Sequence, residues 1–219
     1  MNIFSEIYCS LPREGPGCSE STKRAFSSIS NIPTTASVLD LGCGPGLQTI
    51  ELSQLLKAST GSITAVDHNE TYLEELALKV SEQTIDNIKC KKGLKEWKRI
   101  LKPNGIIAVT ELSWINDGIP KEISEFWSLE YSEMQSVEEN INTAKVCGYH
   151  VESHFTLPES AWFDHYYAPL EIRINELKIK YEDYEEAQKV LNNELKEILM
   201  YKQYSAYYGY EFYVLRSTK

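Results

Sequence analysis

The first half of the chain alternates between short apolar runs and stretches in which apolar residues recur at helical spacing. The apolar runs at residues 37–41 and 62–67 have the length and composition of buried β-strands. Residues 47–57 and 70–83 follow these runs and carry apolar side chains at intervals typical of helices. This order of strand, helix, strand and helix predicts a doubly wound, mostly parallel α/β sheet.

The second half adds one more β-rich run and then a helical, aromatic region. Residues 106–110 are the best candidate for a central strand, after a helix at residues 94–101 that a Pro-Asn-Gly turn ends. Residues 210–216 alternate like a final strand, which we expect to be antiparallel to its neighbours. The other elements expected are a helix from Ser19 to about residue 29 after a loop-rich arm at 1–18, helices at 121–134 and 137–146, a strand at 149–156, and a long helix or a broken pair at 170–204.

Composition and charge exclude several classes of protein. With 22 basic and 32 acidic residues the net charge is −10, which repels phosphate backbones and argues against a nucleic-acid partner. The one basic cluster, at residues 89–102, is interrupted by Glu96 and is expected to be a solvated helix face. Five scattered cysteines without a CxxC pair argue against disulfides and against a metal site. No apolar run approaches the ~18 residues of a membrane span, so we expect a soluble, cytoplasmic protein.

A glycine cluster between the first predicted strand and its helix is the strongest signal in the sequence. Gly42, Gly44 and Gly46 lie at this strand-to-helix turn, where glycine lets the backbone pass close to a ligand. Asp67 follows Gly46 by 21 residues and ends the next predicted strand, where an acid can accept hydrogen bonds from ribose hydroxyls. Tight turns alone can require glycine, so a purely structural role stays open, but the combination predicts a nucleotide-type cofactor.

The spacing of the glycines distinguishes two cofactors. A dinucleotide site normally has the pattern GxGxxG, whereas this chain has GxGxG with Leu47 after it. Asp40 stands two residues before the first glycine. A carboxylate at that position would be repelled by a pyrophosphate, but it suits the cationic amino or sulfonium side of S-adenosyl-L-methionine (SAM). The pattern therefore favours SAM over NAD.

Residues 38–46 resemble motif I of class I SAM-dependent methyltransferases, and Asp67 matches the acid of motif II. Residues 93–105 and 106–114 resemble the helix, turn and fifth strand of small-molecule methyltransferases of the ubiquinone/menaquinone-methylase-like kind. The resemblance implies a Rossmann-like fold, SAM as cofactor and methyl transfer to a small-molecule acceptor. It places one methyltransferase domain over residues 1–219, with an arm and helix at 1–30, the SAM-binding core at 31–115 and substrate-side elements at 116–219. The cofactor-binding residues it implies are Asp40, Gly42, Cys43, Gly44, Pro45, Gly46, Asp67 and His68.

The sequence departs from the family between residues 90 and 93. There the family has a further strand, its loop and a short helix, on the order of 30 residues, whereas only Lys91 and Lys92 stand here. A true deletion would bring residues 106–110 directly beside residues 38–41. Alternatively the printed sequence lacks a segment, which we favour slightly because a lost central strand is costly. A non-catalytic SAM-binding or interaction protein therefore stays open as an alternative, with an NAD-dependent oxidoreductase as a more distant one.

The resemblance leaves the catalytic residues open. Methyl transfer is an in-line displacement that needs a general base only when the acceptor is protonated. Glu111 follows the strand at 106–110 and could meet the substrate or act as a base, although it could also be a solvated acid. His165, in the aromatic run at 162–167, titrates near neutral pH but is as well explained as a loop residue.

The tyrosines are unevenly distributed, since twelve of the fourteen lie beyond residue 130. They could line an apolar or cationic substrate pocket, or simply pack a long helix on the sheet. Arg13 and the glycines at 15–17 could form a lid over the site, although turn chemistry explains these glycines as well. The expected partner is a small-molecule methyl acceptor rather than nucleic acid or a membrane, and a homodimer is left open.

Overall fold

The computed structural model describes residues 3–8, 11–56, 60–67, 69–85, 87–92 and 101–218. The chain divides into two compact units. The first unit consists of Met1–Gly17 and Ala108–Leu215, and the second of Cys18–Ile107 and Arg216–Lys219. Each unit is described by itself below.

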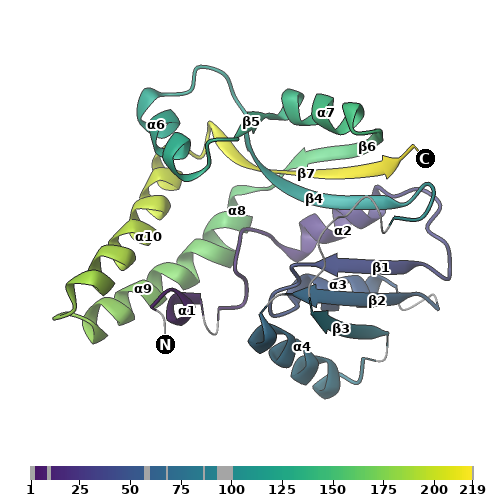
Figure 1. Ribbon diagram of the computed structural model, residues 1–219, viewed down its shortest axis with the longest axis horizontal. Coiled ribbons are helices and arrows are strands. Elements are labelled where there is room, and N and C mark those ends of the chain that lie inside the picture. The colour runs from purple at the N-terminus through teal and green to yellow at the C-terminus, as the bar shows by residue number, and fades with distance from the viewer. Residues whose placement is uncertain are drawn as a thin grey trace. The chain divides into compact units, whose positions relative to one another are not determined.

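In its described residues, the second unit contains a three-stranded parallel sheet together with three helices. Figure 1 shows these strands and helices. Its strands lie in the order β1-β2-β3, and the chain passes through a helix between each strand and the next. The strands are β1 (Ser37–Leu41), β2 (Ser62–Asp67) and β3 (Ile88–Lys92), and the helices are α2 (Ser19–Ser27), α3 (Leu47–Leu55) and α4 (Glu70–Glu82). This βαβαβ arrangement confirms the strands and helices predicted up to residue 83.

Local signals begin α4 and hold it against the sheet. Asn69 caps the helix, because its side-chain oxygen accepts a hydrogen bond from the backbone N–H of Thr71 at 3.1 Å. Leu76 projects from α4 into a small core that also contains Cys43, Ile50 and Ala65. Through this core, α4 packs against the turn after β1, which is the turn that contains the glycine cluster.

Strand β1 differs from the buried strand that its composition predicts. Its side chains are exposed or half-buried, and Leu39 keeps 36% of its surface accessible. Among the described residues β1 pairs with β2 alone, which makes it an edge strand. The expectation that it would be buried is therefore wrong, because a strand is covered fully only when the sheet continues on both of its sides.

After β3 the described chain continues into a second sheet. Strand β4 (Ile106–Trp114) pairs with β5 (Gln135–Ser136) and β7 (Tyr208–Ser217). The helix expected at residues 94–101 lies outside the described residues except for Leu101, which is not helical. The two explanations for the short stretch between residues 90 and 93, a true deletion and a missing segment, stay predictions.

The other sheet has four strands in the order β5-β4-β7-β6, where β6 is Tyr149–Thr156. The backbone N–H of Ile115 donates to the carbonyl of Tyr207, and that of Ser217 donates to the carbonyl of Gly105, each at 2.9 Å. Since one end of β4 thus meets the start of β7 and the other meets its end, the two strands are antiparallel, as predicted and as Figure 1 shows. Helix α7 (Val137–Val146) packs against β6, and α6 (Lys121–Glu130) precedes it in the chain.

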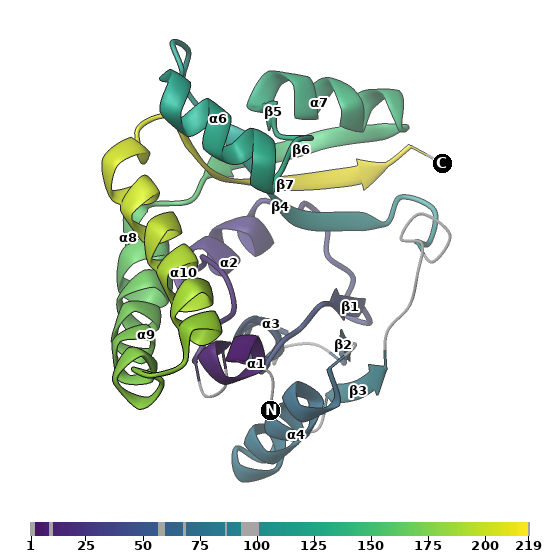
Figure 2. The ribbon, with the colours of Figure 1, turned by 60° about the vertical axis from the view of Figure 1, so that its left-hand side comes forward.

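The aromatic half of the first unit is helical. Helices α9 (Ala168–Lys180) and α10 (Glu185–Tyr204) lie side by side as an antiparallel pair, which both views show (Figures 1 and 2). The broken pair expected over residues 170–204 is thereby confirmed. Helix α8 (Glu159–Trp162) and a π-helical turn, η1 (Phe163–Tyr167), lead into α9.

The N-terminal arm contains a helix that the sequence did not predict, α1 (Ile3–Tyr8). Six residues are too few to form a stable helix in isolation. Contacts with the distant helix pair stabilise it: the Tyr8 hydroxyl donates to Glu194 at 2.7 Å, and the Tyr181 hydroxyl donates to Glu6 at 2.7 Å. Within the described residues, no helix combines the length and the apolar character that crossing a membrane would need.

Candidate functional site

The glycine bend after β1 has the backbone geometry that its sequence predicts. Gly42, Gly44 and Gly46 have φ of 70°, 52° and 89°, in the left-handed region that favours glycine. The backbone N–H groups of Gly42 and Cys43 both donate to the carbonyl of Val66, at 2.8 and 3.1 Å. The bend is therefore tied to the end of β2, and α3 begins directly after it.

The three glycines do not serve the same purpose. A Cβ atom on Gly42 would meet no atom within 4 Å, so this side of the bend is open. A Cβ atom on Gly46 would lie 2.2 Å from Cδ1 of Leu76, which is completely buried. Gly46 thus lets α4 pack against the bend, whereas Gly42 leaves room beside it.

Asp67 faces the bend from the end of β2. Its carboxylate is buried, with 5% of the residue accessible. Oδ2 accepts the backbone N–H of Gly44 at 2.9 Å, and Oδ1 accepts that of Asn69 at 2.9 Å. Each carboxylate oxygen can accept more than one hydrogen bond, so the group can also take ribose hydroxyls. The positions of the open bend and of this acid fit an adenosyl group.

The other implied cofactor residues lie on or next to the bend, except for one outside the described residues. The Thr49 hydroxyl donates to Oδ2 of Asp40 at 2.6 Å, and burial together with the nearby Asp67 raises the pKa of Asp40 against the effect of that bond. Cys43 is buried, and the carbonyl of Pro45 accepts Nζ of Lys79 at 2.8 Å. His68 lies outside the described residues.

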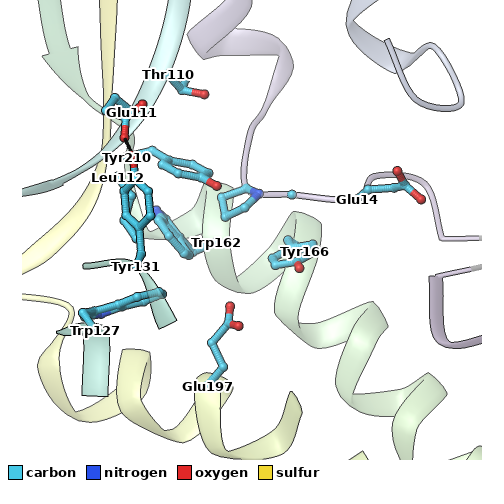
Figure 3. Close-up of a pocket in the computed structure, with 12 residues that line it drawn as sticks. Glu14, Thr110, Glu111, Leu112, Trp127, Tyr131, Trp162, Tyr166, Glu197 and Tyr210 are labelled. Atoms are coloured by element: carbon cyan, nitrogen blue, oxygen red, sulfur yellow. Dashed lines mark hydrogen bonds between the residues drawn. The ribbon is translucent and has the colours of Figure 1, made fainter. Parts of the chain in front are cut away.

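The first unit contains a cavity of about 440 Å³ (Figure 3). This volume lies within the usual range for small-molecule sites, about 300–1,000 Å³. Aromatic rings and carboxylates make up most of its wall, with contributions from the N-terminal arm, β4, α6, α8, η1, α10 and β7. The lining residues are Glu14, Gly15, Pro16, Thr110, Glu111, Leu112, Trp127, Tyr131, Trp162, Tyr166, Glu197 and Tyr210.

Glu197 of α10 directs its carboxylate toward the aromatic rings of the cavity (Figure 3). The Tyr167 hydroxyl donates to its Oε1 at 2.9 Å. Burial raises the pKa of Glu197, as do the neighbouring carboxylates of Glu194 and Glu130, while the bond from Tyr167 opposes the shift. The cavity therefore contains a carboxylate that lacks part of its hydration and has no counter-charge among the lining residues.

The two weak catalytic candidates are placed very differently. Glu111 lines the cavity, where its Oε1 accepts the hydroxyl of Tyr131 at 2.6 Å and raises the pKa of Tyr131 to about 12 (Figure 3). His165 is exposed on η1 and does not line the cavity. Trp114 packs its ring edge-on against Tyr208, with centroids 6.3 Å apart.

Sequence reasoning missed several of the cavity residues, among them Glu197, Trp127 and Tyr210. Glu197 carried a signal: it directly precedes Ile198 and lies four residues before Tyr201 along α10, close to the apolar face of the helix. An acid beside a buried face is a candidate for a polar role. For Trp127 and Tyr210, nothing in the local pattern separates a lining residue from a packing one.

The N-terminal arm, in which Arg13 and the glycines at 15–17 were expected to form a lid, contributes to the wall of the cavity. Gly15 and Pro16 line the cavity, and the backbone N–H of Gly17 donates to the carbonyl of Ala161 at 3.1 Å. Arg13 is buried but is not a lining residue. No group of His, Cys, Asp and Glu side chains among the described residues has an arrangement that would hold a metal ion.

Comparison with known proteins places the glycine bend within a sequence family. Residues 38–93 match the family described as a methyltransferase domain. A search of curated protein sequences gives no significant match. The match covers the bend, Asp67 and β3, which is the part of the chain where motifs I and II were recognised.

Solved structures share the fold over almost the whole chain. A SAM-dependent methyltransferase from Geobacter sulfurreducens, in complex with S-adenosyl-L-homocysteine, has a TM-score of 0.78 at 19% identity and covers 97% of this chain and 96% of its own. One from Thiobacillus denitrificans, in the same complex, has a TM-score of 0.79 at 16% identity, covering 99% and 98%. The [4+2]-cyclase SpnF has a TM-score of 0.68 at 13% identity, covering 94% and 85%.

These matches confirm the predicted fold class, a Rossmann-like α/β fold with parallel strands and an antiparallel last strand. They also agree with the motifs recognised in residues 38–46 and at Asp67. The chain has the fold of the class I SAM-dependent methyltransferases, and its glycine bend lies in a methyltransferase-domain sequence.

Proposed function

We propose that this protein is a SAM-dependent methyltransferase that transfers a methyl group to a small molecule, with residues 1–219 acting as one methyltransferase domain. One observation carries the proposal: the buried carboxylate of Asp67 is hydrogen-bonded to the backbone of an open glycine bend. This arrangement requires both the left-handed glycines and the acid one βα unit downstream. The methyltransferase-domain match and the shared fold support the enzyme class and SAM as its cofactor.

The residues of the bend would hold the cofactor. When bound, SAM supplies an activated methyl group and a neutral leaving group, so the protein mainly has to bind and align the reactants. Asp67 would accept the ribose hydroxyls, and Asp40 would lie toward the cationic end of the cofactor. Gly42, Cys43, Gly44, Pro45 and Gly46 would contribute backbone surface, and His68 stays a prediction from the family resemblance.

The acceptor would bind in the aromatic cavity of the first unit. The cavity volume suits a small molecule, and its carboxylates offer hydrogen-bond acceptors and a base for an acceptor that must lose a proton. Glu111 and Glu197 are the candidates for that base. His165 is a poorer candidate, because it is exposed and does not line the cavity.

One alternative has a specific observation in its favour. The cyclase SpnF shares the fold, and a fold by itself does not decide the reaction. A SAM-binding protein that does not transfer methyl groups would also tolerate β1 as an edge strand, which it is among the described residues. This second reading predicts cofactor binding without turnover.

Calorimetric titration with SAM, S-adenosyl-L-homocysteine and NADH tests the proposal. We expect SAM and S-adenosyl-L-homocysteine to bind and NADH to give no heat. Binding of NADH without a response to SAM would identify a nucleotide oxidoreductase instead. Three statements from the sequence stay predictions: the cytoplasmic location, the absence of a nucleic-acid partner and the homodimer.

A further inference from the structure

We propose that the cavity of the first unit binds its acceptor as an organic ammonium ion that carries no anionic group, with the carboxylate of Glu197 as the counter-charge. This inference rests on the proposed function and names the class of its substrate. It follows from the charges, the rings and the hydrogen bonds of the cavity wall, taken in turn below.

The charged groups of the cavity wall all have one sign. Three glutamates line the cavity, and none of the twelve lining residues is a lysine, an arginine or a histidine. A carboxylate or phosphate on the ligand would meet these acids without a compensating cation and would be repelled. A cation would gain from each of them. The wall therefore selects against anionic and zwitterionic acceptors.

Among the three glutamates, Glu197 is best placed to meet a ligand. Glu14 directs its carboxylate away from the aromatic rings, and Glu111 is bonded to the Tyr131 hydroxyl (Figure 3). Glu197 points toward the rings, and Tyr167 holds its Oε1 in place. Its second oxygen, Oε2, is available to accept a hydrogen bond from an ammonium group or to lie against a methylated one.

Aromatic residues make up five of the nine other lining residues. Trp127, Tyr131, Trp162, Tyr166 and Tyr210 all line the cavity. Trp162 stacks on Tyr201 with centroids 4.4 Å apart and lies 5.0 Å from Tyr210, so packing fixes its orientation. The faces of tryptophan and tyrosine rings attract cations, most strongly where water is excluded, and cages of such rings bind methylated ammonium groups.

The same wall explains how an amine would react. A primary or secondary ammonium ion first gives one proton to the carboxylate of Glu197 or to water, which frees the nitrogen lone pair. That lone pair forms the new N–C bond while the S–C bond of the sulfonium breaks, and the sulfur leaves as a neutral thioether. The product is an N-methylated ammonium ion, whose charge Glu197 and the rings can again balance.

Two probes of the same shape separate charge from size. Choline has a permanent positive charge, and 3,3-dimethylbutan-1-ol is its neutral carbon isostere. Titrated separately into the protein at pH 8 without cofactor, choline should bind roughly tenfold or more tightly than the isostere, the scale of a desolvated cation–π contact. Equal affinities, tighter binding of the isostere, or no binding of choline would overturn the proposal.

Matched variants locate the effect. Glu197→Gln keeps the shape of the side chain and removes its charge, and should weaken choline binding roughly 10- to 100-fold, the scale of a hydrogen bond or contact to a charged group. The control is Glu194→Gln, one turn away on α10, whose carboxylate accepts the Tyr8 hydroxyl and does not line the cavity. It should change binding by less than about twofold. An equal loss in both variants would indicate a diffuse negative potential and overturn the role of Glu197.

The pH profile adds a readout that altered packing would not move. Choline has the same charge at every pH, so a change in its binding reports the protein. Because burial raises the pKa of Glu197, binding should weaken as the pH falls through that raised value, and Glu197→Gln should remove this step. SAM binding, measured separately, keeps the two proposals apart: choline binding without SAM binding contradicts the enzyme class, whereas SAM binding with preference for the neutral probe contradicts the ammonium site.

Discussion

The glycine bend and the aromatic cavity are built in opposite ways. The bend consists of backbone from five consecutive residues, 42–46, together with one carboxylate from the next strand. The cavity consists mainly of side chains that reach it from residue 14 to residue 210 of the sequence. One is a short local motif, and the other is assembled from segments that are distant in the chain.

This difference shows which part of the molecule can change and which cannot. Backbone geometry at Gly46 depends on the absence of a side chain, so almost any substitution strains the fold. The rings and acids of the cavity are side chains on elements that exist for other reasons, such as α10 and β7. Their substitution should alter the ligand before it alters the fold, as is expected where one fold supports several reactions.

The strongest test of the comparison replaces glycines within the bend. Gly46→Ala should lower the free energy of unfolding by about 2–5 kcal/mol, because left-handed backbone costs about 1–2 kcal/mol and the new Cβ would also overlap the buried Leu76, at about 1–3 kcal/mol. Gly42→Ala has the same backbone strain but open space, so about 1–2 kcal/mol is expected. Urea unfolding followed by circular dichroism measures both. Equal losses would show that Leu76 does not constrain the bend.

A second test addresses the acid that faces the bend. Asp67→Ala should weaken SAM binding by about 1.5–3 kcal/mol, since it removes a charged hydrogen-bond acceptor. Glu74→Ala, which removes an exposed acid from α4 in the same unit, is the control and should leave binding unchanged. Calorimetry measures both variants. An unaltered affinity in Asp67→Ala would mean that the ribose assignment is wrong.

The smallest expected effect concerns how the stability of the first unit, which contains the cavity, changes with pH. Burial raises the pKa of Glu194, so the folded protein binds this proton more tightly than the unfolded chain does. Stability from this group is therefore greatest below the ordinary carboxyl pKa and is lost as the pH rises through the raised value. Glu194→Gln should flatten that decline, with the remainder due to Glu197 and Asp40, whose pKa values are also raised.

Urea unfolding at several pH values, followed by tryptophan fluorescence, measures this slope. Three of the four tryptophans, Trp114, Trp127 and Trp162, belong to the first unit and dominate the signal. Glu182→Gln, at an exposed acid after α9, is the control and should keep the wild-type slope. A steeper decline in Glu194→Gln would contradict the sign of the effect.

Much of the second unit could be predicted because its signals are local. The strands at 37–41 and 62–67, the helices between them and the position of Asp67 all follow from periodicity and glycine spacing within a few residues. What failed there was the environment of β1, since burial depends on whether another strand lies beside it, and the sequence of β1 carries no information about that neighbour.

The bend could be inferred from local sequence alone, because a left-handed turn favours glycine wherever it occurs in a fold. The cavity, its aromatic wall and the position of Glu197 depend on long-range packing, because a tyrosine or an acid has the same local preferences whether it lines a cavity or packs against a helix. The stability of helix α1 was likewise decided by the tertiary structure, because it comes from side chains 175 and 186 residues away, which no local pattern can indicate.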